Sequence, residues 1–254
     1  MTQHARFPWL LVLVLAVATL AACGGQNEAP ASSAAPIANP VDPATAGSIS
    51  GRIVFEGPPP AAEPISMRSD PNCQADGEAT SEAVMVSSNG GLQNAFVYVK
   101  DGLGDLEFPV PAATLVLSQQ GCRYTPRVIG IQVGQPLEIV NGDPTLHNIH
   151  AVARINREFN AGQPIQGMKM THTFTAREVM VPFKCDVHNW MNAWVGVLEH
   201  PFFAVTTADG AFELNGLPPG TYTIEAWHEK LGTQTQMVTI GPKETKELSF
   251  TFKL

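Results

Sequence analysis

Positive charge is scarce in this sequence. Its 254 residues hold 15 lysines and arginines against 23 aspartates and glutamates, a formal net charge of −8. Proteins that bind nucleic acid have the opposite balance, so the composition argues against a nucleic-acid partner and permits a basic protein partner. A membrane-length hydrophobic run is also missing, because the apolar stretch from Trp9 to Leu20 is too short and too early to span a bilayer.

Helical periodicity is almost absent from the chain. Short runs rich in Val, Ile, Thr and Phe are separated by Gly, Pro, Asn and Asp, a pattern typical of an all-β sandwich. A short helix is expected near residues 156–161, and residues 70–82 are expected to form a loop. The predicted strands are residues 48–56, 92–100, 113–118, 127–133, 136–141, 147–154, 168–175, 179–183, 193–199, 203–206, 211–214, 221–227, 234–240 and 246–252.

The first 22 residues are predicted to be an export signal, because a short start with one arginine precedes the apolar run and small residues. Residues 20–25 read Leu-Ala-Ala-Cys-Gly-Gly, which resembles the lipobox of bacterial lipoproteins. The resemblance implies that Cys23 carries lipid; the alternative is an ordinary signal peptide with an incidental cysteine. Residues 23–46 lack hydrophobic periodicity and are predicted to be a disordered tether. The protein is therefore expected on the periplasmic side of a bacterial membrane, the outer membrane being favoured over the inner.

Two domains are predicted, residues 47–200 and residues 201–254. Residues 209–214 and 217–224 form a turn, a strand, a Pro-Gly turn and a second strand, which is a tight hairpin. This hairpin resembles those of carboxypeptidase-regulatory or transthyretin-like modules, and the resemblance implies a smaller β-sandwich without catalytic chemistry. Residues 51–57 resemble the opening strand of such modules. The sequence therefore leaves open which of the two domains contains the strand at 48–56.

One loop carries three side chains of metal-binding type. Residues 183–191 read Phe-Lys-Cys-Asp-Val-His-Asn-Trp-Met, which places a thiol, an imidazole and a thioether close together between two predicted strands. Upstream, a turn at residues 141–146 brings His147 to the start of another strand. Two histidines and one cysteine with a weak axial methionine are the ligands of blue-copper electron-transfer sites.

The spacing Cys-x2-His-x2-Met, preceded by a distant His-Asn pair, resembles the cupredoxins, and the loop length is similar to that of amicyanin. The resemblance implies a Greek-key β-sandwich over residues 47–200. It also implies that one copper ion, alternating between Cu(I) and Cu(II), is bound by His147, Cys185, His188 and Met191.

The same resemblance assigns roles to neighbouring residues. Asn148 is expected to steady the cysteine sulfur through its backbone or its side chain. His188 is expected to be the ligand nearest solvent, through which electrons pass. Independently of the resemblance, the candidates for the apolar shell that tunes the potential are Phe183, Trp190 and Trp194. Trp190 either borders a docking surface or packs inward.

Each of these residues also has an assignment other than a copper ligand. His150 competes with His147, but residues three apart on a strand point to opposite faces. The alternative for Met191 is that its side chain only fills the hydrophobic core. His172 lies on a Met/Met/Phe face and is expected in the core. Zinc is disfavoured because thioether suits copper better. A multicopper oxidase is disfavoured because His-x-His pairs are missing and Lys184 precedes the cysteine, so the chain is not expected to be an enzyme.

Cysteine counting gives a further expectation. Of the four cysteines, Cys23 is assigned to lipid and Cys185 to the metal. Cys73 and Cys122 remain, and in an oxidising compartment they are expected to form a disulfide. The alternative, a second metal site, lacks nearby histidines in the sequence.

These features together predict an extracytoplasmic protein that carries single electrons between redox partners. The expected partners are a redox protein, for example a c-type cytochrome or a dehydrogenase, and the membrane through the lipid anchor. Two other functions stay open: a copper storage or delivery protein with labile metal, and a surface scaffold without metal.

Overall fold

The computed structural model describes residues 37–74 and 79–254. The predicted export signal, Cys23 and most of the predicted tether lie outside the described residues. Within these residues, no helix has the length and apolar character needed to cross a membrane. The described chain is almost entirely β, as the residue pattern predicted, and its one helix, α1, covers Pro71–Gln74.

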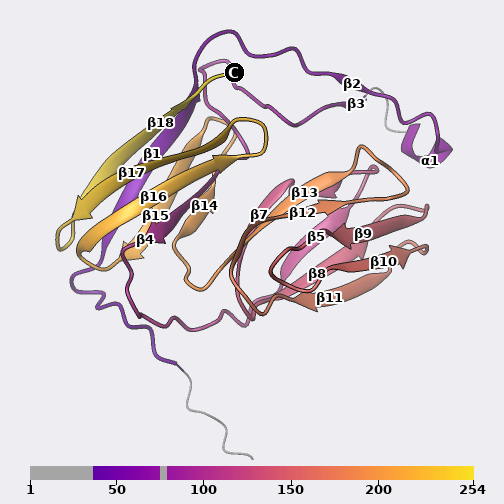
Figure 1. Ribbon diagram of the computed structural model, residues 1–254. Coiled ribbons are helices and arrows are strands. Elements are labelled where there is room, and N and C mark those ends of the chain that lie inside the picture. The colour runs from indigo at the N-terminus through magenta and orange to yellow at the C-terminus, as the bar shows by residue number, and fades with distance from the viewer. Residues whose placement is uncertain (1–36, 75–78) are drawn as a thin grey trace, which may run out of the picture. The chain divides into compact units, whose positions relative to one another are not determined.

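A first β-sandwich is built from two sheets with strand orders β15-β1-β18 and β14-β4-β16-β17 (Figure 1). Their apolar faces share one buried core, in which Ile49, Val97, Ile224 and Phe250 are at most 1% exposed. The strands are β1 (Gly47–Phe55), β4 (Phe96–Asp101), β14 (Phe203–Val205), β15 (Ala211–Leu217), β16 (Gly220–His228), β17 (Gly232–Ile240) and β18 (Thr245–Phe252).

A second β-sandwich has the strand orders β10-β9-β12-β13-β7 and β11-β8-β5-β6. Leu117, Ile139, Ile149 and Val195 are fully buried in its core. Inward and outward residues alternate along β8, as expected for a sheet with one solvated face. The strands are β5 (Leu115–Gln119), β6 (Tyr124–Thr125), β7 (Val128–Gln132), β8 (Pro136–Asn141), β9 (His147–Ala151), β10 (Phe159–Gln163), β11 (Lys169–Thr173), β12 (Glu178–Lys184) and β13 (Asn192–Leu198).

The strand pairing does not follow the predicted division at residue 200. Strand β1 pairs with β15 and, in parallel, with β18, so that Ile53 lies beside Phe250. Strand β4 pairs with β14 and β16. The first sandwich therefore takes strands from residues 47–101 and from the C-terminal segment, because β1 joins β15 to β18 in one sheet and β4 joins β14 to β16 in the other. The strand at 48–56, left open by the sequence, belongs with the C-terminal strands.

Two smaller expectations are also corrected. Residues 156–161 do not form a helix: Phe159–Gln163 is strand β10, paired with β9, and its alternate residues are the more buried ones. The end of the predicted tether is folded, since Val41 packs on the first core and the Lys243 backbone N–H donates to the Thr45 carbonyl at 3.0 Å.

The two sandwiches meet through aromatic side chains. A side chain at Gly130 or Gly196, which are paired across β7 and β13, would collide with Phe203 or Phe96 within 2.5 Å. Only glycine therefore allows these phenylalanines to lie flat on the strands. Nearby, the rings of Trp194 and Trp227 are 5.1 Å apart.

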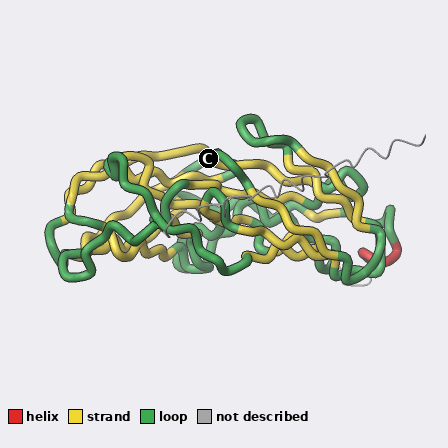
Figure 2. Tube along the Cα trace, turned by 90° about the horizontal axis from the view of Figure 1, so that it is seen from below, coloured by secondary structure: helices red, strands yellow, loops and turns green. Residues whose placement is uncertain are grey.

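The segment before β4 adds a small cover to the second sandwich. It contains β2 (Pro64–Ile65), α1 and β3 (Ala79–Thr80), with β2 and β3 paired antiparallel. Both views place α1 beyond the strand ends of this sandwich, beside its loops (Figures 1 and 2). The sequence predicted only a loop at residues 70–82.

Candidate metal centre

Three of the predicted ligands come together in the second sandwich. The Nδ1 atoms of His147 and His188 are 2.9 Å apart, and the Cys185 Sγ is 3.8 Å from the Nδ1 of His188. One ligand atom from each residue lies within 4.8 Å of the others. All three side chains are at most 2% exposed. This is a closed, buried set of one sulfur and two nitrogen donors.

Strand pairing explains why these residues meet. His147 opens β9 and Cys185 directly follows β12, and these two strands are antiparallel neighbours with Lys184 opposite His150. The loop to β13 is closed by its own backbone, since the Cys185 N–H donates to the Met191 carbonyl at 3.2 Å. The His188 N–H donates to the Cys185 Sγ at 3.3 Å. The loop therefore holds sulfur and imidazole together before any ligand binds.

Met191 is the fourth predicted ligand. It is 1% exposed, belongs to the same buried cluster as Cys185, and its N–H donates to the His188 carbonyl at 3.0 Å. The methionine therefore ends the loop at the base of the site. Whether its sulfur acts as an axial ligand stays a prediction.

Each of the two histidines contacts a carboxylate through its Nε2 atom. The Nε2 of His147 is 2.8 Å from the Asp143 Oδ2, and the Nε2 of His188 is 3.1 Å from the Asp70 Oδ2. Ionised carboxylates only accept hydrogen bonds, so both Nε2 atoms carry the proton. Both Nδ1 atoms then direct lone pairs toward the shared space. This pattern, carboxylate to imidazole to open nitrogen, is the one that orients metal-ligating histidines.

The donor set fits a metal ion. Two bare nitrogens facing each other at 2.9 Å in a buried site repel unless a proton or a metal ion lies between them. Ligands bound to one ion at about 2.0 Å for nitrogen and about 2.3 Å for sulfur lie about 3 to 4 Å from one another. The observed separations of 2.9 and 3.8 Å fall close to that range. Two imidazoles, a thiolate and a thioether are the set that copper prefers.

Each carboxylate is itself fixed by donors. Asp143 accepts the backbone N–H groups of Gly121 and Cys122, both at 2.8 Å. Asp70 accepts the Thr145 hydroxyl at 2.5 Å, and this bond is the main reason that the pKa of Asp70 is lowered. Burial lowers the pKa of His147, which favours the neutral imidazole that a metal needs.

The prediction that His188 is the ligand nearest solvent is wrong. Its side chain is 1% exposed because the segment from Asp70 to α1 covers it. The expected disulfide is present between Cys73 and Cys122, and the Cys73 Sγ lies 3.7 Å from the His188 Nε2. The contact of this segment with His188 could not be predicted from the sequence, because Asp70 lies 118 residues upstream of the histidine.

Asn148 acts on the loop backbone instead of the cysteine sulfur. Its Oδ1 accepts the Asp186 N–H at 2.6 Å and the Val187 N–H at 3.4 Å. Within the described chain, the hydrogen bond given to the Cys185 sulfur by a backbone N–H comes from His188. The expected role of Asn148 is therefore corrected: it holds the turn that follows the cysteine.

Phe183 and Trp190 lie near the site in different ways. Phe183 is 1% exposed and shares the buried cluster of Cys185. Trp190 is half-buried, and its ring lies 5.0 Å from that of His188. The Trp190 Nε1–H donates to the Cys122 carbonyl at 3.1 Å. Trp190 thus packs on a predicted ligand and still reaches the surface, which combines the two alternatives.

The remaining histidines near the site are not part of the donor set. His150 points away from His147, and its ring nitrogens meet Asp186 at 2.8 Å and Glu158 at 2.6 Å. His172 is half-buried and stacks on Phe159 with ring centroids 4.1 Å apart. The alternation along β9 separates His150 from His147, as expected, whereas His172 lies on β11 in the other sheet.

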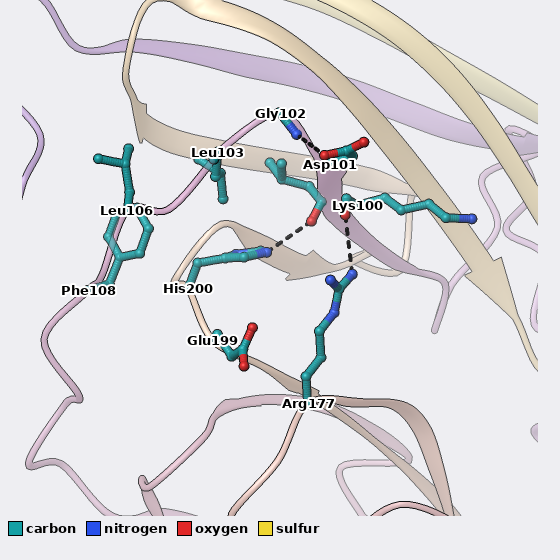
Figure 3. Close-up of a pocket in the computed structure, with 11 residues that line it drawn as sticks. Lys100, Asp101, Gly102, Leu103, Leu106, Phe108, Arg177, Glu199 and His200 are labelled. Atoms are coloured by element: carbon teal, nitrogen blue, oxygen red, sulfur yellow. Dashed lines mark hydrogen bonds between the residues drawn. The ribbon is translucent and has the colours of Figure 1, made fainter.

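A small pocket of about 130 Å³ lies elsewhere, between β4 and the end of β13 (Figure 3). Its polar groups are already committed: the His200 Nε2–H donates to the Val99 carbonyl at 2.9 Å, and Arg177 donates to the Lys100 carbonyl at 3.2 Å. Burial lowers the pKa of His200 to about 4. His200 and Arg177 are therefore engaged in hydrogen bonds to the backbone of β4. Among the described residues, this pocket does not bring together side chains that could carry out a reaction.

Comparison with known proteins bears on both halves of the chain. Residues 192–253 match the family model of the carboxypeptidase regulatory-like domain. The match confirms the resemblance seen in the hairpin at residues 209–224. It begins at β13, in the second sandwich, and contains β14 to β18. No curated protein sequence matches the chain.

Among solved structures, similar chains include cupredoxins, the family that the Cys-His-Met loop resembles. A purple cupredoxin from Nitrosopumilus maritimus is 22% identical, with a TM-score of 0.29, over 34% of this chain and 98% of that one. A Cu(I) form of an amicyanin variant is 21% identical, with a TM-score of 0.31, over 41% and 98%.

A copper-containing nitrite reductase from Thermus scotoductus SA-01 is 19% identical, with a TM-score of 0.33. The similarity covers 40% of this chain but only 26% of the reductase, so the chain spans about a quarter of its length. At TM-scores this low, likeness alone carries no inference about the site. The assignment of the metal rests on the side chains of this chain.

Proposed function

We propose that this protein is a mononuclear blue-copper protein that carries single electrons between redox partners outside the cytoplasm. The observation that carries the proposal is the meeting of two bare imidazole nitrogens and one thiol in a buried site, with a carboxylate behind each imidazole. Bound copper would supply a one-electron couple, Cu(II)/Cu(I). The proposed attachment to the membrane is through lipid on Cys23.

The protein's own residues would make the electron transfer fast. The loop closed by the Cys185 and Met191 backbone keeps sulfur and imidazole in place in either oxidation state. Asp143 and Asp70 hold the imidazole rings, and burial excludes water and outside ligands. The ligand side chains would therefore need to move little when the copper gains or loses one electron. No bond to a substrate would form.

Copper delivery is less well supported than electron transfer. A delivery protein must present ligands to the acceptor, whereas the cysteine and both histidines are at most 2% exposed. The disulfide-held segment over His188 also blocks the approach of a second protein to that ligand.

The direct test compares two histidines on one strand. A soluble form starting after Cys23 should take up one equivalent of Cu(II) and gain an intense visible absorption. His147→Ala should abolish that absorption, with a loss of affinity beyond the roughly 10–100-fold that follows loss of an outer hydrogen-bond partner. His150→Ala, on the opposite face, should keep both. An unsubstituted protein that stays colourless with copper would contradict the proposal.

Asp143→Asn is expected to raise the reduction potential. The carboxylate makes the His147 imidazole more basic, and a basic imidazole favours Cu(II) over Cu(I). Each tenfold loss of Cu(II) affinity relative to Cu(I) raises the potential by about 59 mV. Voltammetry would measure it. Asp186→Asn removes an equal charge from a carboxylate that bonds neither imidazole ligand, so a shift of equal size there would refute the hydrogen-bond explanation.

A further inference from the structure

None of the predicted copper ligands reaches the surface. His147 is 0% exposed, His188 and Met191 are 1% exposed, and Cys185 is 2% exposed. An electron that enters or leaves must therefore cross at least one further group. Since transfer slows steeply with distance, the residue that both contacts a ligand and meets solvent matters most.

Trp190 has both properties. Its ring lies 5.0 Å from the His188 ring, at an interplanar angle of 40°. The same side chain also lines a groove of about 620 Å³ together with Trp194, Asn192 and Arg127. The hydrogen bond from its Nε1 to the Cys122 carbonyl fixes the ring against the imidazole. Cys122 is joined by the disulfide to the segment that covers His188, so one bridge supports both the cover and the ring.

Other aromatic neighbours of the site lack one of the two properties. Phe183 is 1% exposed and packs on Phe159 and Phe174 in the core. Tyr124 is 2% exposed, and its hydroxyl donates to the carbonyls of Asn148 and Lys184. Among the described residues, Trp190 is the aromatic side chain that joins a predicted ligand to a groove.

We propose that Trp190 is the electron relay of this centre, which connects His188 to the groove. The proposal rests on the proposed copper function and specifies its route. An outside donor would give up one electron, which would pass through the indole to the Cu(II) ion that His188 would help to hold, leaving Cu(I) and the donor oxidised by one electron. The indole is not itself oxidised, and no proton moves and no bond forms.

The test measures reduction of the Cu(II) protein by hexaammineruthenium(II) in stopped flow. Trp190→Leu removes the ring and is expected to slow the reaction about tenfold or more, which corresponds to a barrier about 1.4 kcal/mol higher. Trp190→Phe keeps a ring on His188 and should recover most of the rate. Trp194→Leu is the matched control, because Trp194 lines the same groove and packs on Trp227.

The outcomes separate the relay from the copper site. A slow Trp190→Leu variant with unchanged absorption and potential, beside a normal Trp194→Leu variant, supports the relay. Equal rates in all variants overturn it, and so does equal slowing by both leucines, which would mean that the groove only admits the reagent. Absence of the thiolate absorption in the unsubstituted protein would instead overturn the copper function on which the relay rests.

Discussion

Cys185→Ser is expected to abolish the thiolate-to-copper absorption completely. A serine hydroxyl stays protonated at neutral pH and is a poor ligand for copper, whereas a metal-bound cysteine gives up its proton. The substitution is nearly isosteric, and the serine oxygen can still accept the His188 N–H that now bonds the sulfur. The fold should therefore survive. Visible and EPR spectra after one equivalent of Cu(II), with circular dichroism as the check of folding, would measure the effect.

Met191→Leu is the companion variant, since the structure leaves the role of this buried side chain as a prediction. A weak axial ligand can be lost without loss of the blue absorption, but its loss changes the reduction potential. An unchanged potential in Met191→Leu would show that the methionine only fills the core. A persistent blue absorption in Cys185→Ser would contradict the whole assignment of the site.

The local part of the structure could be predicted from the sequence. Alternation of apolar and polar residues and the Gly, Pro and Asn turns depend on neighbours in the chain, so β8 was predicted with its exact bounds. The Cys185–Met191 loop could be recognised for the same reason, because its predicted ligands lie within one loop between two strands. His147 and His150 could be told apart by the alternation of a single strand.

Long-range pairing could not be predicted in this way. Strand β1 lies parallel to β18, which is about two hundred residues away in the sequence. The residue pattern of Gly47–Phe55 does not predict which strand it pairs with. A parallel pair needs a long connection, and here the connection contains the entire second sandwich. The division at residue 200 was wrong because it assumed that neighbours in sequence fold together.

The contacts that Asp143 and Asp70 make with the histidines also could not be predicted from the sequence. Asp143 lies four residues before His147 in a recognised turn, so its position was visible, but its direction depends on the N–H groups of Gly121 and Cys122. Asp70 reaches His188 from 118 residues away. The exposure predicted for His188 came from a family resemblance, and the segment that covers the histidine has no counterpart in that resemblance.

The disulfide between Cys73 and Cys122 is expected to contribute the second large effect. It closes a separation of 49 residues, for which the chain-entropy relation gives about 4 kcal/mol of stabilisation. The double variant Cys73→Ser, Cys122→Ser should lose free energy of unfolding of that order, measured by urea denaturation of the metal-free protein. A loss below about 1 kcal/mol would contradict this expectation, and would indicate that the segment also gains freedom in the folded protein once the bond is removed.

The same variant should also change the metal centre. Cys73 lies against His188, and the Cys122 carbonyl accepts the Trp190 indole N–H, so both the cover and the ring depend on the bridge. We expect a Cu(I) chelator to remove copper faster from the double variant than from the unsubstituted protein. Asp70→Asn is the matched comparison, because it weakens the bond to His188 and leaves the disulfide intact. If only the double variant loses copper quickly, the covalent bridge itself is what keeps the centre closed.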